Sequence, residues 1–332
     1  MERPELSWLV MQAENVGNNV RELNIDLCVD IAQTTTQTLE GKDTLLSKLI
    51  NRLPNIRSLT VRALSVPIFN LPRFIQSMAT LKSVRHLQII EIISSISREA
   101  TEPIRCPVTN GVVYEVVKSS GDQLLSLVFD GHSSLQPETF NAIRSIPTKL
   151  ETLLLGECIG IDCREALCEE VPWACRSTLR HLGFYDCRGA HSGGITCGVA
   201  SGLWSTCLRT LEVCKSGDHS DIRGLPYHIE PRTQPLTLER AHFEHAFEWE
   251  IVLLGRLRVR ELTLTLLPRR RMLQIVLDID SFPGMKRLTL GSKPDGAELD
   301  DGTIQAACDE RRLDVSFNGK PILGCTCSYG KN

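Results

Sequence analysis

The chain lacks the features that mark most enzymes, membrane proteins and secreted proteins. Its 332 residues contain no G-x-S-x-G, no H-E-x-x-H and no phosphate-binding loop, so we do not expect an enzyme. No aliphatic run approaches the roughly 20 residues that a membrane helix needs. The N-terminus has no basic stretch ahead of an apolar one, so no signal peptide is expected. A net charge of −3 gives no reason to expect nucleic acid or a membrane surface as a partner.

Cysteine is plentiful, but the spacing typical of metal sites is missing. Eight of the 13 cysteines lie between Cys158 and Cys214, and no C-x-x-C pair occurs in the chain. His242 and His245 are three residues apart but have no evident third ligand. We therefore expect no metal and no cofactor. Reduced thiols in the cytoplasm or the nucleus are the preferred interpretation.

What the chain does contain is one apolar pattern that returns eleven times. The clearest copies are Leu150, Leu153, Leu155 with Cys158, and the matching copy that begins at Leu179. The first copy reads L-x-x-L-x-L-x-x-C, which is the leucine-rich-repeat signature, and the second differs only in Phe184 at the last leucine position. From Leu124 onward the copies begin 25 to 29 residues apart. The eleven expected starts are Val20, Ile56, Val84, Leu124, Leu150, Leu179, Leu208, Thr233, Val259, Met285 and Glu310.

This pattern predicts the architecture. The last two apolar positions of each copy are two residues apart, so both point to one face of a strand. One repeat cannot cover that face, and therefore neighbouring repeats must stack around a shared core. We predict an α/β leucine-rich-repeat solenoid of about 11 repeats, with a curved parallel sheet on the concave face and helices and loops on the convex face. An N-terminal helix or cap is expected over residues 1–19, the solenoid over 20–318 and a flexible tail over 319–332.

Several connecting segments also have a predicted structure. Asp43 is expected to cap a helix that buries Leu46 and Ile50, and Pro137 is expected to open another helix. Residues 269–280 have the spacing of a third helix. Residues 94–111 contain two prolines and have no clear period, so they are predicted to form a loop that projects from one rim and carries recognition, or else a tolerated surface insertion.

The residues that alternate with the leucines should line the concave face, and most of them are small or polar. The expected centre differs, because apolar and aromatic side chains from neighbouring repeats meet there. Such a cluster is typical of a partner-binding surface. The alternatives are ordinary packing across the strands or cover by residues 94–111. The predicted partner-binding residues are Ile90, Val128, Asp130, Leu154, His181 and Tyr185.

A basic residue also precedes the strand in most repeats. A stacked column of positive charges is able to hold an acidic partner or a phosphate. A solvated rim with local ion pairs is the simpler interpretation, since Glu151 interrupts the column. The basic residues are Arg21, Arg57, Arg85, Arg180, Arg209, Arg260, Lys286 and Arg311.

Three parts of the sequence resemble a known family. They are the opening stretch Arg3-Pro4-Glu5-Leu6-Ser7-Trp8-Leu9-Val10, the following Val20-Arg21-Glu22-Leu23, and later L-R-x-L units such as Leu208-Arg209-Thr210-Leu211. They are similar to the segment after the F-box in fungal F-box/leucine-rich-repeat proteins. The resemblance implies a substrate receptor of an SCF ubiquitin ligase that holds a protein partner on its concave face. A free-standing repeat scaffold without a ligase link is the alternative.

The F-box itself is not expected within this sequence. An F-box is a helical module that opens with Leu-Pro and binds a Skp1-type adaptor. Leu71-Pro72 is followed by one short helical stretch and then by the strand that contains Leu87 and Ile89. The resemblance therefore implies a Skp1-type adaptor only if an F-box lies upstream of Met1.

Overall fold

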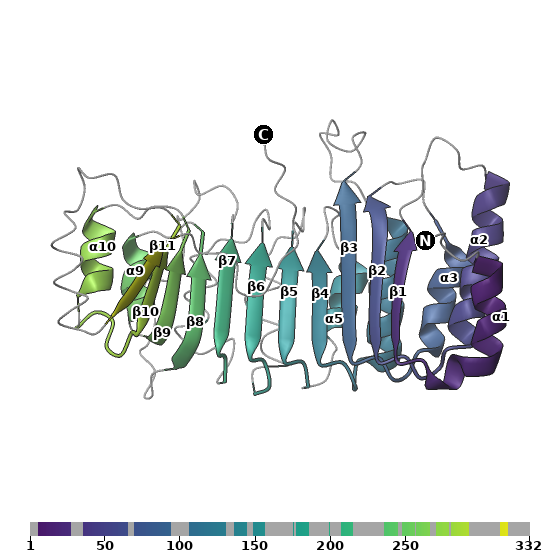
Figure 1. The fold of residues 1–332 in the computed structure, drawn as a ribbon, viewed down its shortest axis with the longest axis horizontal. Helices are drawn as coiled ribbons and strands as arrows, with labels where there is room; N and C mark the ends of the chain where they lie inside the picture. Colours follow the sequence, from purple (N-terminus) through teal and green to yellow (C-terminus); the bar gives the residue numbers. More distant parts are fainter. Residues whose placement is uncertain are drawn as a thin grey trace. The chain divides into compact units, whose positions relative to one another are not determined.

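The computed structural model of the protein contains one parallel sheet whose strands follow one another in chain order, β1 to β11 (Figure 1). It describes residues 6–27, 36–65, 70–93, 106–130, 136–144, 149–156, 175, 177–185, 199, 207–214, 236–244, 248–255, 257–265, 270–278, 280–291 and 313–317. The strands are β1 (Glu22–Leu27), β2 (Ser58–Ser65), β3 (His86–Ile93), β4 (Ser126–Asp130), β5 (Thr152–Gly156), β6 (His181–Tyr185), β7 (Thr210–Cys214), β8 (Thr237–Phe243), β9 (Arg258–Leu264), β10 (Arg287–Leu290) and β11 (Asp314–Phe317).

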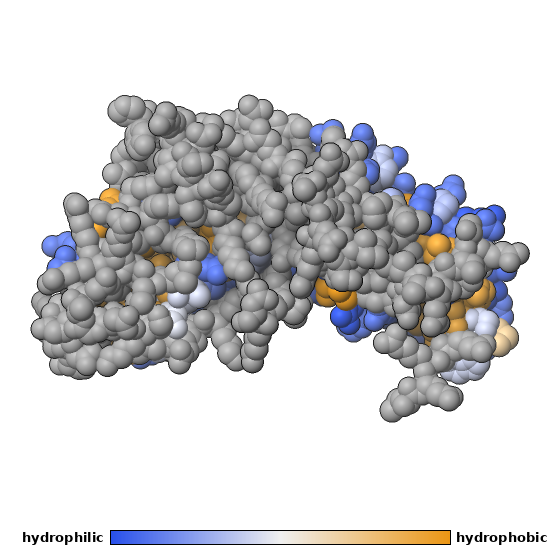
Figure 2. Space-filling model, turned by 90° about the horizontal axis from the view of Figure 1, so that it is seen from above, coloured by the Kyte–Doolittle hydropathy of each residue, from blue (hydrophilic) through white to orange (hydrophobic). Residues whose placement is uncertain are grey.

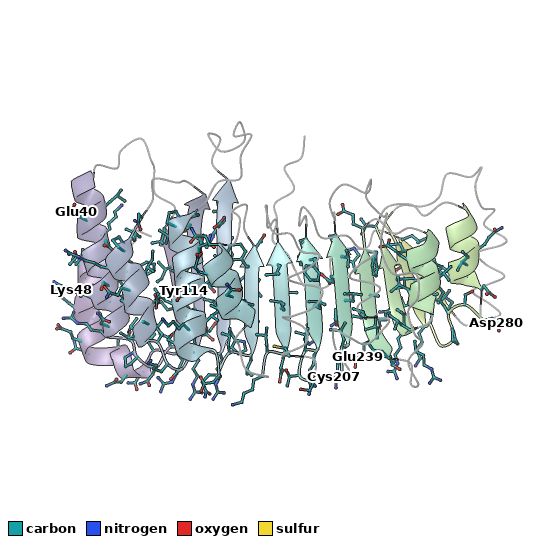
Figure 3. The ribbon with its side chains drawn as sticks, turned by 180° about the vertical axis from the view of Figure 1, so that it is seen from behind. Glu40, Lys48, Tyr114, Cys207, Glu239 and Asp280 are labelled. Atoms are coloured by element: carbon teal, nitrogen blue, oxygen red, sulfur yellow. The ribbon has the colours of Figure 1, made fainter. Side chains whose placement is uncertain are left out.

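Helices occupy connections between the strands. In the first part of the chain α4 packs against β2 and β3 (Figures 1 and 3). The helices are α1 (Leu6–Val16), α2 (Thr36–Asn51), α3 (Pro72–Ser77), α4 (Pro107–Ser120), α5 (Pro137–Arg144), α9 (Glu248–Gly255) and α10 (Arg270–Leu277), with short 3-10 turns η1 (Gly17–Asn19) and η3 (Met78–Thr80). The leucine-rich-repeat architecture predicted from the sequence is confirmed.

The contacts within the chain divide it into two compact units. Unit 1 comprises Met1–Thr152 with Glu157–Ile161, and unit 2 comprises Leu153–Gly156 with Asp162–Asn332. The predicted division into a cap, a solenoid and a tail stays a prediction, and residues 319–332 lie outside the described residues.

Seen from above, unit 1 presents mainly hydrophilic residues with smaller apolar patches between them (Figure 2).

The repeat register explains why these strands form. In unit 1, Leu23, Leu59, Leu87 and Leu127 are partners across neighbouring strands, as the pattern predicts. The side chains of Leu59, Leu87 and Leu127 are buried, and the next apolar position of each repeat is buried as well. We call this the inward face of the sheet and the opposite side the outward face. Burial of the inward face is the main source of stability, because each strand alone would expose it to water.

Two repeats are in a different register from the one predicted. Ala241 of β8 lies opposite Leu211 and Leu262, so this repeat begins at Leu238 and not at Thr233. Alanine occupies a position where the pattern expects leucine, and this hid the true start. In β11, Val315 lies opposite Leu288, which moves the last repeat two residues later than Glu310. A shift of two residues leaves each side chain on its expected face, because strand side chains alternate with a period of two.

The predicted projecting loop is also partly wrong. Residues 94–105 lie outside the described residues, but Pro107 begins helix α4 and Gly111 lies within it. The helix buries Val112, Val113 and several other residues, yet valine has a low helix propensity, so the stretch does not read as helical. Gly111 lets α4 approach α3 closely, since a Cβ there would lie 2.8 Å from the side chain of Ile75.

The helices of successive repeats are joined by buried polar side chains. Asp43 lies inside α2, not at its start as predicted, and its carboxylate accepts hydrogen bonds from the backbone N–H groups of Arg73 (3.1 Å) and Phe74 (2.7 Å). It therefore caps α3, a helix that begins with proline and has no side-chain cap of its own. In α4, Asn110 accepts the N–H of Gln136 at 2.8 Å, just before α5 begins. In both cases a polar side chain of one helix accepts a backbone N–H group at the start of the next helix.

Replacing Asp43 by alanine should therefore destabilise unit 1. We expect the free energy of unfolding to fall by about 1–2 kcal/mol, because two N–H groups at the start of α3 lose their acceptor. Urea denaturation followed by far-ultraviolet circular dichroism measures this. Glu40→Ala in the same helix is the control, since Glu40 is exposed. Equal losses in the two variants would show that the cap contributes nothing.

Candidate protein-interaction surface

The outward face of β1 to β4 in unit 1 is accessible at every described position. Backbone pairing fixes three rows across these four strands. All twelve side chains are exposed or half-exposed, whereas the inward side chains beside them are buried, apart from the half-buried Leu23. The three rows are Glu22, Ser58, His86 and Ser126; Asn24, Thr60, Gln88 and Val128; and Asp26, Arg62, Ile90 and Asp130.

Three of the six predicted site residues meet on this face. Val128 lies opposite Gln88, and Ile90 lies opposite Asp130, so the two apolar side chains are diagonal neighbours on β3 and β4. All three predicted residues are half-buried. Burial raises the pKa of the Asp130 carboxyl, because removal from water disfavours its charged form. Unit 1 thus carries a small apolar pair within a polar face.

The other three predicted residues are in unit 2, and two of them are not exposed as expected. Leu154 is 8% exposed and Tyr185 is 3% exposed. Both side chains lie over Gly183, where an added Cβ would be 2.7 Å from Leu154 and 3.1 Å from Tyr185. The missing side chain of Gly183 gives them room to pack across the strands. His181 is half-buried, and a partner-binding role for these residues stays a prediction.

Unit 2 buries polar groups on the same outward face. The hydroxyl of Tyr185 on β6 donates a hydrogen bond to the carboxylate of Glu212 on β7, and Glu212 is completely buried. On β7 and β8, Cys214 Sγ lies 3.7 Å from His242 Nδ1, and the other ring nitrogen of His242 lies 2.6 Å from the hydroxyl of Thr265. On this part of the outward face, polar side chains are therefore buried as well as apolar ones.

Sequence reasoning missed this His242 group because it assigned the wrong register to β8. With Thr233 as the repeat start, the neighbour of Glu212 was expected to be Thr237, but it is His242. Alignment of Leu238, Ala241 and Phe243 with the repeat would have placed it correctly. Burial lowers the pKa of His242 to about 4, so its ring is neutral near pH 7 and a weak base. This environment does not favour an activated cysteine at Cys214.

The predicted basic column is present in both units but is interrupted. In unit 1, backbone bonds of 2.7 to 2.8 Å join Arg21 to Arg57 and Arg57 to Arg85, and the next strand continues with Leu125. In unit 2, Arg209 is followed by Glu239, which lies at the lower end of the strands in Figure 3 and pairs with Arg209 at 3.5 Å. The arginine side chains are exposed, as a solvated rim requires. Residue Arg311 lies outside the described residues.

Two further classes of site are absent from the described residues. Within the described ranges, no three His, Cys, Asp or Glu side chains gather closely enough to hold a metal ion. None of the helices that the structure describes has the length and apolar content needed to cross a bilayer.

Comparison with known proteins gives no family. No protein-family model matches the chain, and no curated protein matches it. Among solved structures, the tropomodulin C-terminal domain of Caenorhabditis elegans is similar over 52% of this chain and 92% of its own, with 11% identity and a TM-score of 0.30. A chain of the yeast Rad7 and Elc1 complex is similar over 94% of this chain and 77% of its own, with 12% identity and a TM-score of 0.44.

Proposed function

We propose that this chain is a protein-interaction module of the substrate-receptor type, similar to the repeat region of fungal F-box proteins in SCF ubiquitin ligases. It holds a protein partner in the cytoplasm or the nucleus, and the proposal includes no catalytic step, cofactor or nucleic acid. The observation that carries it is the outward face of β1 to β4, where all twelve side chains reach the surface. The proposed docking surface is therefore this face of unit 1.

The chemistry of this face suits a protein partner. Parallel strands hold their side chains in rows about 4.8 Å apart on a backbone that the buried inward face keeps in place. Ile90 and Val128 supply an apolar centre, and most of the other positions are polar or charged. An apolar centre with a polar rim is the usual composition of a protein–protein interface. The pair is small, so the proposal is for a modest contact in which polar residues set the specificity.

Substitution of the apolar pair tests the docking surface. We expect the double variant Ile90→Arg/Val128→Arg to lose at least about tenfold in affinity for a protein that the wild-type chain captures, because two desolvated apolar contacts become charged. Val252→Arg is the matched control, since Val252 is 46% exposed on α9 in unit 2. Binding is measured by titration with the captured protein, and folding by thermal melting. Unchanged affinity in the double variant would remove this face from the proposal.

The ligase part of the proposal has its own test. The gene product, expressed with whatever sequence precedes Met1, should copurify with a Skp1-type adaptor, and this chain alone should not. Absence of the adaptor from both preparations would leave the docking surface intact but favour the free-standing scaffold. The two experiments therefore address the partner and the ligase separately.

A further inference from the structure

One row of side chains crosses the outward face of unit 2. At one end of the row the charged groups are paired, and at the other end polar groups have no hydrogen-bond partner. Backbone pairing places the six members on neighbouring strands, β6 to β11. At the β11 end, Arg287 contacts Asp314 at 3.1 Å and Glu261 at 3.5 Å, so two carboxylates share one guanidinium. The row is His181, Thr210, Arg240, Glu261, Arg287 and Asp314.

The β6 end of this row has unused hydrogen-bonding groups. Thr210 is completely buried, and its hydroxyl has no hydrogen-bond partner. The Nδ1 atom of its neighbour His181 is also buried without a partner. Folded proteins rarely leave such groups unsatisfied, because the cost of desolvation is not recovered. Two of them side by side indicate a site that is completed by another molecule.

The charges around this end favour an anion. Arg240 lies next to Thr210 on β8, and within the part of the chain that the structure describes its guanidinium has no hydrogen-bond or ion-pair partner. Burial lowers the pKa of His181, and Arg240, Arg209 and Arg180 nearby lower it further. Glu239 acts in the opposite direction but is paired with Arg209. Glu212, in the next row, is engaged by Tyr185.

We propose that His181, Thr210 and Arg240 form a binding site for an oxyanion, namely a phosphate or a carboxylate on a protein side chain. The Thr210 hydroxyl and a ring N–H of His181 would donate to its oxygens, and the Arg240 guanidinium would hold it with charge-assisted hydrogen bonds. Thr210 lies between two half-buried side chains, and binding requires that one of them rotates to open its hydroxyl to the ligand. This site lies in unit 2 and goes beyond the proposed docking face in unit 1.

Titration of the wild-type chain with sodium phosphate and with sodium sulfate is the first test. The ring signals of His181, assigned by their loss in His181→Gln, should move saturably with either anion. Sulfate keeps its charge between pH 5 and 8, so tighter binding at the lower pH reports protonation of His181 and not of the ligand. Acetylated amides of phosphoserine and of glutamate then distinguish a phosphate from a carboxylate. Signals of His181 that do not move with any of these probes would overturn the proposal.

Two variants separate the site from general attraction to positive charge. Arg240→Ala should weaken sulfate binding roughly 10- to 100-fold, as expected for a lost charge-assisted hydrogen bond. Arg258→Ala removes the same charge from an exposed position outside the row and should have little effect. Equal losses in the two variants would mean nonspecific binding and would overturn the proposal.

Thr210→Val tests the hydroxyl, because valine keeps the shape and removes the unsatisfied group. Sulfate binding should weaken while the melting temperature does not fall. A melting temperature that falls by several degrees would show that the hydroxyl has a structural partner, and the proposed site would then be wrong. Failure of this site leaves the Ile90 and Val128 experiment on unit 1 unaffected.

Discussion

Replacing Leu182 by alanine is expected to lower the free energy of unfolding by roughly 2–5 kcal/mol. Leu182 lies on the inward face of β6, is completely buried and pairs in register with Leu211 of β7. The truncated side chain leaves a cavity between stacked repeats, and the neighbouring strands cannot close it without breaking their own pairing. Loss of transfer free energy and loss of packing therefore add. Chemical denaturation followed by circular dichroism measures the change.

The control for this prediction is Val252→Ala on α9. Val252 is 46% exposed, so its truncation should cost less than about 1 kcal/mol. Both residues belong to unit 2, and the comparison is therefore made within one folding unit. If the two variants were equally stable, Leu182 would not face the core and the repeat register of β6 would be wrong.

The sequence pattern predicted the strands well where leucine itself occupies the repeat positions. Leu59, Leu87 and Leu127 stack as expected, because burial of alternate residues is the physical cause of both the pattern and the fold. The pattern failed at β8, where Ala241 takes the position of a leucine. Alanine is small enough to be buried there but carries no sequence signal, so the register of this repeat depended on its neighbours.

Helix starts were harder to predict because their partners are distant in sequence. Asp43 followed by apolar residues looks like a local N-cap, yet its carboxylate binds backbone groups 30 and 31 residues further on. Helix α4 is stabilised by packing of its valines and by its close approach to Ile75, not by helix propensity. Tertiary contacts decide both features, and no short window of sequence contains them.

The candidate surface shows a similar limit. Ile90 and Tyr185 belong to the same predicted face, but Ile90 is half-exposed and Tyr185 is buried. Alternation along a strand tells which side chains point outward, but it does not tell whether they remain accessible. In unit 2 the glycine at position 183 and the hydrogen bond to Glu212 bury Tyr185. Of the six predicted site residues, the three in unit 1 and the half-buried His181 therefore remain accessible.

The stability of unit 2 is expected to depend on pH through His242. Burial lowers the pKa of its imidazole from the ordinary value of 6.5 to about 4, so the folded protein resists a proton that the unfolded chain accepts. Above pH 6.5 the titration of His242 does not lower the free energy of unfolding. As the pH falls from 6.5 toward 4, the free energy of unfolding decreases. Since one pKa unit corresponds to about 1.4 kcal/mol, the loss amounts to roughly 3 kcal/mol. The neighbouring Glu212 is engaged by Tyr185.

Denaturation curves at several pH values between 4 and 7 measure this dependence, and variants isolate it from the titration of other groups. His242→Gln should flatten the profile relative to the wild type, because the uncharged amide cannot take up the proton. His86→Gln, at an exposed position on β3, is the control for loss of an imidazole as such. A wild-type slope that persists in His242→Gln would assign the acid sensitivity to other groups, and His242 would then have an ordinary pKa in an accessible environment.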